Sequence, residues 1–86
     1  MRKRESKKIK KLKQIATELI YEDEAFIEIL RLRIKDEDKI REILKDLLKK
    51  AIRLVYKARG LSNKEAYNFL YRKIKRLKER VILKLT

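Results

Sequence analysis

Apolar residues recur along most of the chain at steps of three and four positions, with charged residues between them. This spacing gathers the apolar side chains on one face of an α-helix. Proline is absent and Gly60 is the single glycine, so little in the sequence interrupts a helix. The pattern predicts an all-α fold, a small bundle of three to four helices with a helix-turn-helix reversal at Gly60.

The first two predicted segments cover residues 6–21 and 22–34. The inner stripe of the first segment consists of Ile9, Leu12, Ala16, Leu19 and Ile20. The second segment opens with three acidic residues, which suit the positive end of a helix dipole, and Asp23 is the expected cap. Residues 30–34 alternate between apolar and basic, which also fits a strand, but so short a strand has no partner elsewhere in the chain. We therefore predict a helix there.

The third predicted segment, residues 37–59, has the most regular apolar spacing. Its inner stripe consists of Ile40, Leu44, Leu47, Ala51, Leu54 and Ala58. Two ion pairs are expected on its exposed face, Glu37 with Arg41 and Asp46 with Lys50. Each would add only about 0.3 kcal/mol, so packing must supply most of the stability.

A chain reversal is expected after the third segment. Gly60 can take the left-handed conformation that closes a helix, with Leu61 folding back on the last turn. Ser62 and Glu65 match the capping box Ser-x-x-Glu, so a fourth helix should start at Asn63. The inner face of this helix consists of Ala66, Leu70, Ile74, Leu77, Val81 and Leu85.

Length and composition set further bounds. Residues 1–86 suffice for one domain, in which residues 1–13 form a basic N-terminal extension of the first helix. Cysteine and histidine are absent, which excludes disulfides and the commonest transition-metal ligands, so we expect no metal and no cofactor. The acidic triplets 22–24 and 36–38 offer carboxylates to a magnesium ion, but helix capping explains both without a metal.

The sequence also suggests where the protein works. No apolar run is long enough to span a membrane and no secretory signal is visible, so we expect a cytoplasmic protein without a membrane partner. Abundant Lys, Glu and Ile, without Trp, Pro, Cys or His, match thermophile proteins, although an AT-rich genome also enriches Lys and Ile.

Charge is sorted along the chain. Residues 1–13 contain 8 Lys/Arg and 1 Glu, residues 14–48 contain 6 Lys/Arg and 10 Asp/Glu, and residues 49–86 contain 13 Lys/Arg and 2 Glu. The net charges are +7, −4 and +11, within a total of +14. Two basic ends around an acidic middle concentrate a positive field that attracts a polyanion. Nucleic acid, either RNA or DNA, is therefore the leading partner.

The candidate contact residues lie on three of the predicted helices. Arg72, Arg76 and Arg80 form a ridge that repeats every ~6 Å, close to the phosphate spacing along a nucleic-acid strand. Tyr67 and Tyr71 can stack on bases. The basic residues that broaden the ridge are Lys73, Lys75, Lys78 and Lys84, and those expected to contact nucleic acid from the other helices are Lys49, Arg53, Lys57, Lys7, Lys10 and Lys11. We predict contacts mainly with the phosphate backbone.

Other interpretations stay open. The charged runs also fit solvated helix faces, and both tyrosines fit the rim of a core. A nucleoid or virion DNA-packing protein is the runner-up, followed by a helical protein-interaction subunit that binds an acidic partner and by a protein that binds anionic membranes through its first helix. We expect a homodimer, because the stripe of residues 40–58 and the apolar residues 81–83 offer more surface than four helices readily cover.

One stretch resembles a nucleic-acid-binding family. Its residues are Ala51, Leu54, Val55, Gly60-Leu61-Ser62, Glu65-Ala66-Tyr67 and Leu70-Tyr71-Arg72. They resemble the ANTAR domain of bacterial transcription antiterminators, although the short helix that ends that domain has no counterpart here. The resemblance implies RNA contact through the final helix and dimerisation through the helix before it.

A second stretch resembles an enzyme. Residues 38–48 are similar to part of the long first helix of all-helical chorismate mutases, but Ala51 stands where that family's pattern has an arginine. Nucleophilic catalysis lacks its usual base in a chain without histidine. We therefore expect no enzymatic activity, with a chorismate-mutase-like enzyme as the alternative.

Overall fold

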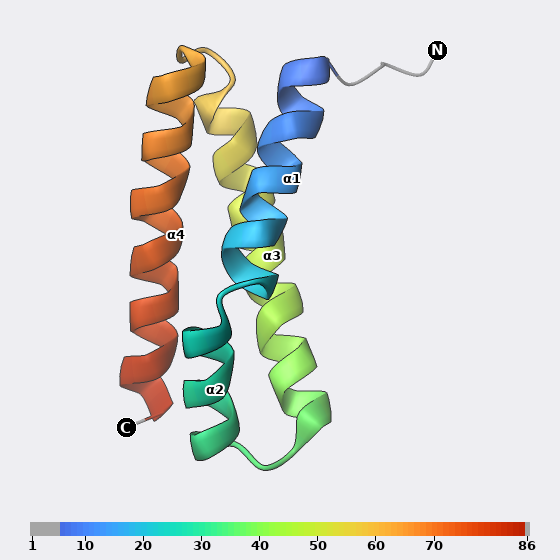
Figure 1. Ribbon diagram of the computed structural model, residues 1–86, viewed down its shortest axis with the longest axis vertical. Helices are drawn as coiled ribbons and strands as arrows, with labels where there is room; N and C mark the ends of the chain where they lie inside the picture. Colours follow the sequence, from blue (N-terminus) through green and yellow to red (C-terminus); the bar gives the residue numbers. More distant parts are fainter. Residues whose placement is uncertain (1–5, 86) are drawn as a thin grey trace.

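The computed structural model describes residues 6–85, which form four helices and no strand (Figure 1). The helices are α1 (Lys7–Tyr21), α2 (Glu24–Arg33), α3 (Glu37–Ala58) and α4 (Asn63–Leu85). The predicted all-α bundle is confirmed, including a helix where the alternation of residues 30–34 also fitted a strand. Residues 1–5 of the predicted basic extension lie outside the described residues, and residues 7–13 belong to α1 itself.

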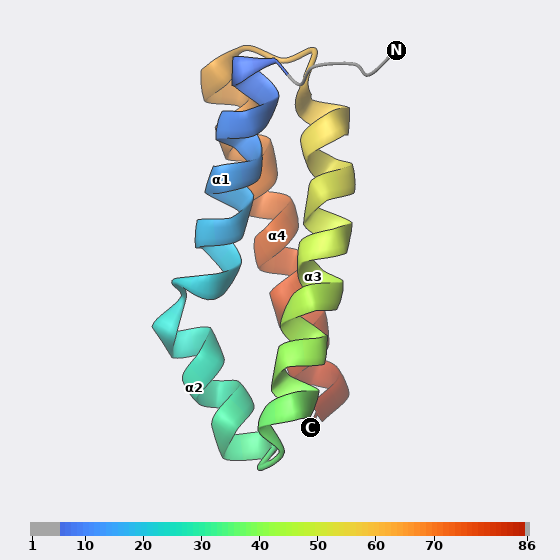
Figure 2. The same ribbon diagram turned by 90° about the vertical axis from the view of Figure 1, so that its right-hand side faces the viewer.

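The bundle has three sides. The long helices α3 and α4 run antiparallel, and α1 and α2 follow one another along the third side (Figures 1 and 2). α1 packs on both α3 and α4, and α2 packs on the other ends of the same two helices. The result is an elongated molecule of 42 × 29 × 18 Å, in which two short helices take the place of one long one.

One hydrophobic core runs along the bundle. Its buried residues are Ile9, Leu12, Ala16, Ile20, Phe26, Leu30, Ile40, Leu44, Leu47, Ala51, Val55, Ala58, Ala66, Leu70 and Ile74. The predicted stripe of α3 is buried except for Leu54, which is half-buried. This stripe is thus covered within the chain and does not offer the surface that we expected for dimerisation. Large apolar side chains are exposed elsewhere: Leu32 is 73% and Leu83 is 70% exposed.

Each helix begins at a side-chain cap, and the caps at Asp23 and Ser62 agree with the prediction. The side chains of Ser6, Asp23 and Asp36 each accept a hydrogen bond from a backbone N–H two or three residues on, at 2.9 to 3.1 Å. Ser62 and Glu65 form the expected capping box: the Glu65 N–H donates to the Ser62 hydroxyl at 3.2 Å, and the Ser62 N–H donates to the Glu65 carboxylate at 3.4 Å. These bonds satisfy N–H groups that have no partner within the helix.

The turn between α3 and α4 differs from the prediction. No glycine in residues 6–85 has a positive φ, so Gly60 does not take the left-handed conformation. The chain instead leaves α3 through a tight turn, in which the Leu61 N–H donates to the Ala58 carbonyl at 3.0 Å. This three-residue bond reverses the chain without a conformation that favours glycine. The predicted reversal is confirmed, but its predicted geometry is wrong.

The surface ion pairs of α3 agree with the prediction in part. Lys50 and Asp46 pair at 3.2 Å as expected. Arg41 pairs with Asp38 at 3.4 Å, three residues away, and the Glu37 carboxylate lies 4.0 Å from Arg31 of α2. All these side chains are at least half-exposed, so the pairs contribute little to stability.

Lys78 of α4 contacts and stabilises the junction between α1 and α2. Its ammonium donates a hydrogen bond to the Leu19 carbonyl at 2.7 Å and pairs with the Asp23 carboxylate at 2.6 Å. The same ammonium lies 5.7 Å from the ring centroid of Phe26, within the range of a cation–π contact. With a side chain only 14% exposed, Lys78 is a structural residue. Our prediction that it broadens the basic ridge is wrong.

The other end of α1 is fastened to the turn after α3. The Lys8 ammonium donates a hydrogen bond to the Leu61 carbonyl. Lys13 lies with its ammonium 5.2 Å from the ring centroid of Tyr56 on α3. Contacts at both ends therefore fix the position of α1 along the bundle.

The pKa of Asp23 is lowered by its surroundings. Burial raises the pKa of this carboxyl, but the hydrogen bond from Lys78, the hydrogen bond from the Phe26 N–H and the charge of Lys78 together outweigh burial. Because the folded state lowers the pKa, the carboxylate stabilises the fold above the ordinary pKa of an aspartate in an unfolded chain. That contribution is lost as the pH falls through the lowered pKa.

Asp23→Asn tests this contribution. Asparagine also caps helices, so the substitution removes mainly the charge, and it should lower the free energy of unfolding at pH 7 by about 1–2 kcal/mol. Urea unfolding followed by circular dichroism should show the difference from wild type shrinking as the pH falls toward 2. The control is Asp46→Asn, whose exposed pair should cost less than about 0.5 kcal/mol. An equal loss at both pH values would contradict the role of the charge.

Gly60→Ala tests the geometry of the turn. A Cβ at this position meets no atom within 4 Å, and φ is not positive. Alanine should therefore raise the free energy of unfolding by about 0.4–1 kcal/mol, because it restricts the unfolded chain. The measurement is a thermal or urea melt, and a loss of stability would instead indicate a left-handed Gly60.

Candidate nucleic-acid interface

The fold gathers most of the described basic residues at one end of the bundle. The start of α1, the second half of α3 and the first half of α4 all lie at this end, which is uppermost in Figure 1. We call residues 6–13 and 49–76 the basic end; their net charge is +14. The remaining described residues, 14–48 and 77–85, form the opposite end and have a net charge of −2. The long axis of the molecule is thus also the axis along which charge is separated.

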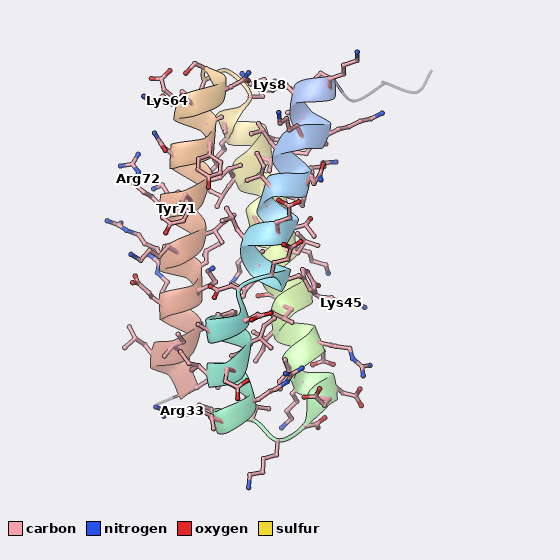
Figure 3. The ribbon with its side chains drawn as sticks, viewed as in Figure 1. Lys8, Arg33, Lys45, Lys64, Tyr71 and Arg72 are labelled. Carbon is pink, nitrogen blue, oxygen red and sulfur yellow. The ribbon has the colours of Figure 1, made fainter. Side chains whose placement is uncertain are left out.

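The arginine ridge lies on the outer surface of α4. A shallow hollow on this helix is lined by four of the predicted contacts: Arg72, Lys73, Lys75 and Arg76. The same hollow is lined by Phe69 and Glu79. Arg72 points away from the bundle at the outer edge of α4 (Figure 3). Lys73 leans over Phe69, with its ammonium 5.8 Å from the ring centroid.

Arg80 is exposed on α4 but does not line this hollow. Residues four apart on a helix rotate about 40° around its axis, so a ridge with this spacing slants around the helix. Of the three arginines in the predicted ridge, Arg72 and Arg76 therefore line the hollow together. Arg80 lies apart from them, one turn further along the helix.

A second basic surface is the groove between α1 and the start of α4. Its lining residues are Lys7, Lys8, Lys11, Leu12 and Ile15 from α1 and Asn63, Lys64 and Tyr67 from α4. Lys8 and Lys64 lie at the same end of the bundle in Figure 3. Three predicted contacts, Lys7, Lys11 and Tyr67, thus lie together in this groove, whereas Lys10 is exposed on α1 and does not line it.

Of the two predicted tyrosines, one lines this groove and the other lies next to it. Tyr67 and Tyr71 stack with their ring centroids 6.4 Å apart and their planes at 24°. They are 44% and 49% exposed. Tyr67 lines the α1–α4 groove, and Tyr71 lines the adjoining groove below it, where α4 meets the α1–α2 junction. Lys75 lines both this lower groove and the hollow of Arg72, and so connects the tyrosines to the arginines.

The predicted contacts on α3 occupy its outer face. Lys49, Arg53 and Lys57 are exposed. Lys57 lies seven residues after Lys50, and Lys50 lines a groove against α4. Lys49 lies seven residues before Tyr56, whose ring contacts α1. Since residues seven apart share a helix face, Lys57 lies toward α4, Lys49 toward α1 and Arg53 between them. These three residues therefore lie on the exposed face of α3 and do not extend the arginine ridge.

Sequence reasoning missed two lysines of the groove, Lys8 and Lys64. Lys64 is separated from the other basic residues of α4 by seven positions, so no run of charge marks it. Lys8 belongs to the basic start of α1 but was not singled out. Both are found only once the start of α4 is placed against α1.

None of the helices within residues 6–85 is both long and apolar enough to cross a membrane. Comparison of the chain with protein-family models, with curated proteins and with solved structures gave no match.

Proposed function

We propose that this protein binds nucleic acid, RNA or DNA, through its basic end. The observation that supports the proposal is the gathering of a net charge of +14 in residues 6–13 and 49–76, while the opposite end has a net charge of −2. Like charges held close together repel one another, and folding must overcome this repulsion. A bound polyanion would relieve it and would release counterions on binding.

The kinds of side chain favour contact with phosphates. Lysines and arginines on exposed helix faces reach phosphate oxygens without entering a groove, and arginine can donate two hydrogen bonds to one phosphate. Phosphate contacts fix the position of a protein on nucleic acid but do not read its sequence. We therefore propose binding that is strong at low salt and tolerant of sequence.

The arginines of α4 provide the first test. Changing Arg72, Arg76 and Arg80 together to Gln should flatten the dependence of log K on log salt by about 2 to 3 units. The measurement is fluorescence anisotropy with labelled DNA and RNA at several salt concentrations. The matched control changes Arg33, Lys35 and Lys39 to Gln, which removes the same charge from the opposite end and should change the slope by less than one unit. Equal slopes for the two triple variants would contradict binding through the arginines of α4.

An acidic protein partner is the second candidate function, and the same assay separates it from the first. Polyglutamate supplies negative charge without phosphates or bases. If polyglutamate displaces labelled nucleic acid at equal charge concentration, general attraction to acidic polymers explains the binding. Under our proposal it should compete at least tenfold less well, because arginine pairs more strongly with phosphate geometry.

We also propose that two copies associate through the opposite end. The exposed Leu32 and Leu83 lie at that end, and its net charge of −2 adds little repulsion between copies. Sedimentation equilibrium at tens of micromolar protein in moderate salt should detect a dimer, and Leu32→Lys should shift it toward monomer. Low salt should also favour monomers, because the basic ends repel over a longer distance. A single monomeric species throughout would contradict the proposal.

A further inference from the structure

We infer that the basic end prefers single-stranded to duplex nucleic acid and that Tyr67 and Tyr71 form its stacking surface. This inference deepens the proposed function and depends on it. Its starting point is the pair itself, two half-exposed rings one turn apart on α4 that stack with planes at 24°. Close to half of the surface of each tyrosine is exposed, whereas Ala66, Leu70 and Ile74 of the same helix are buried in the core.

The tyrosines lie on a path that joins two basic surfaces. On one side, Tyr67 shares a groove with Lys7, Lys11 and Lys64. On the other side, Tyr71 shares a groove with Lys75, which also lines the hollow of Arg72. A strand that follows this path would meet lysines, then two aromatic rings, then a lysine and an arginine. Proteins that bind single strands combine these two elements, a basic groove for the backbone and aromatic rings for the bases.

A duplex would leave the rings without a partner. Its bases stack on one another, so their faces are not available to a side chain unless the helix is opened. The same lysines and arginines could contact duplex phosphates, but the tyrosines would then contribute nothing. The separation of the tyrosines from most of the arginine ridge makes the two contributions testable one at a time.

The experiment compares Tyr67→Leu/Tyr71→Leu with wild type. Leucine keeps the apolar contact at the rim and suits a helix, but it removes the ring. The probes are a 20-nucleotide oligo(dT), an oligo(U) of the same length and a duplex of the same length. The double variant should bind both single strands about 5- to 100-fold more weakly and the duplex within twofold of wild type. The slope of log K against log salt should stay unchanged, because stacking releases few counterions.

Two controls accompany it. Tyr21→Leu changes an exposed tyrosine outside the basic end and should leave all affinities unchanged. Tyr67→Phe/Tyr71→Phe keeps the rings and should retain at least half of the single-strand affinity. If the leucine variant does not fold, the wild-type protein still decides the matter, since it has four tyrosines and no tryptophan. Its tyrosine fluorescence should be quenched by oligo(dT) and not by the duplex.

The outcomes separate the two proposals. Equal loss of affinity for duplex and single strands, no loss for either, or equal quenching by both would overturn the stacking site while nucleic-acid binding stands. Absence of binding to every probe at low salt would overturn the proposed function itself.

Discussion

The bundle depends on the contact between Lys78 and the α1–α2 junction. The third side of the bundle is interrupted between α1 and α2 at residues 22–23, where a helix end exposes carbonyl groups and a new helix requires a cap. Lys78 donates to the Leu19 carbonyl and pairs with the capping carboxylate of Asp23, so one ammonium serves both helix ends. A half-buried carboxylate without this partner would be costly. Because the contact holds α1 and α2 against α4, it also sets where the lysines at the start of α1 lie.

The fold brings basic residues together that the order of charges along the chain leaves apart. Basic residues at the two ends of a sequence can lie anywhere in space. Here the antiparallel course of α3 and α4 returns the chain to the level where α1 begins, and Lys8 bonds to the turn at Leu61. The acidic middle of the chain then occupies the remainder of the bundle. The concentration of positive charge is therefore a product of topology, and the core must hold it together against repulsion.

The fold could be predicted largely from the sequence, and the site only in part. Apolar spacing and caps such as Asp23 and Ser62 determine helices locally, and local signals are readable without knowledge of the partner helix. Contacts between helices are not local. The sequence does not indicate that Lys78 is half-buried at a junction while Lys75, three residues earlier, is exposed, or that Lys64 joins the lysines of α1. Gly60 misled us because glycine permits a left-handed turn without requiring one.

The separation of charge along a 42 Å axis has a mechanical consequence. A molecule with charge concentrated at one end experiences a torque in the field of a polyanion, as well as an attraction. It would turn before contact, so that most encounters begin with the same end forward and few are spent on unproductive orientations. If the basic end binds a polyanion, the same polarity directs the exposed Leu32 away from it, where the proposed contact with a second copy stays accessible. Molecules bound side by side along one strand would then all direct α2 outward. The outer surface of such an array would consist of α2 side chains and not of phosphates.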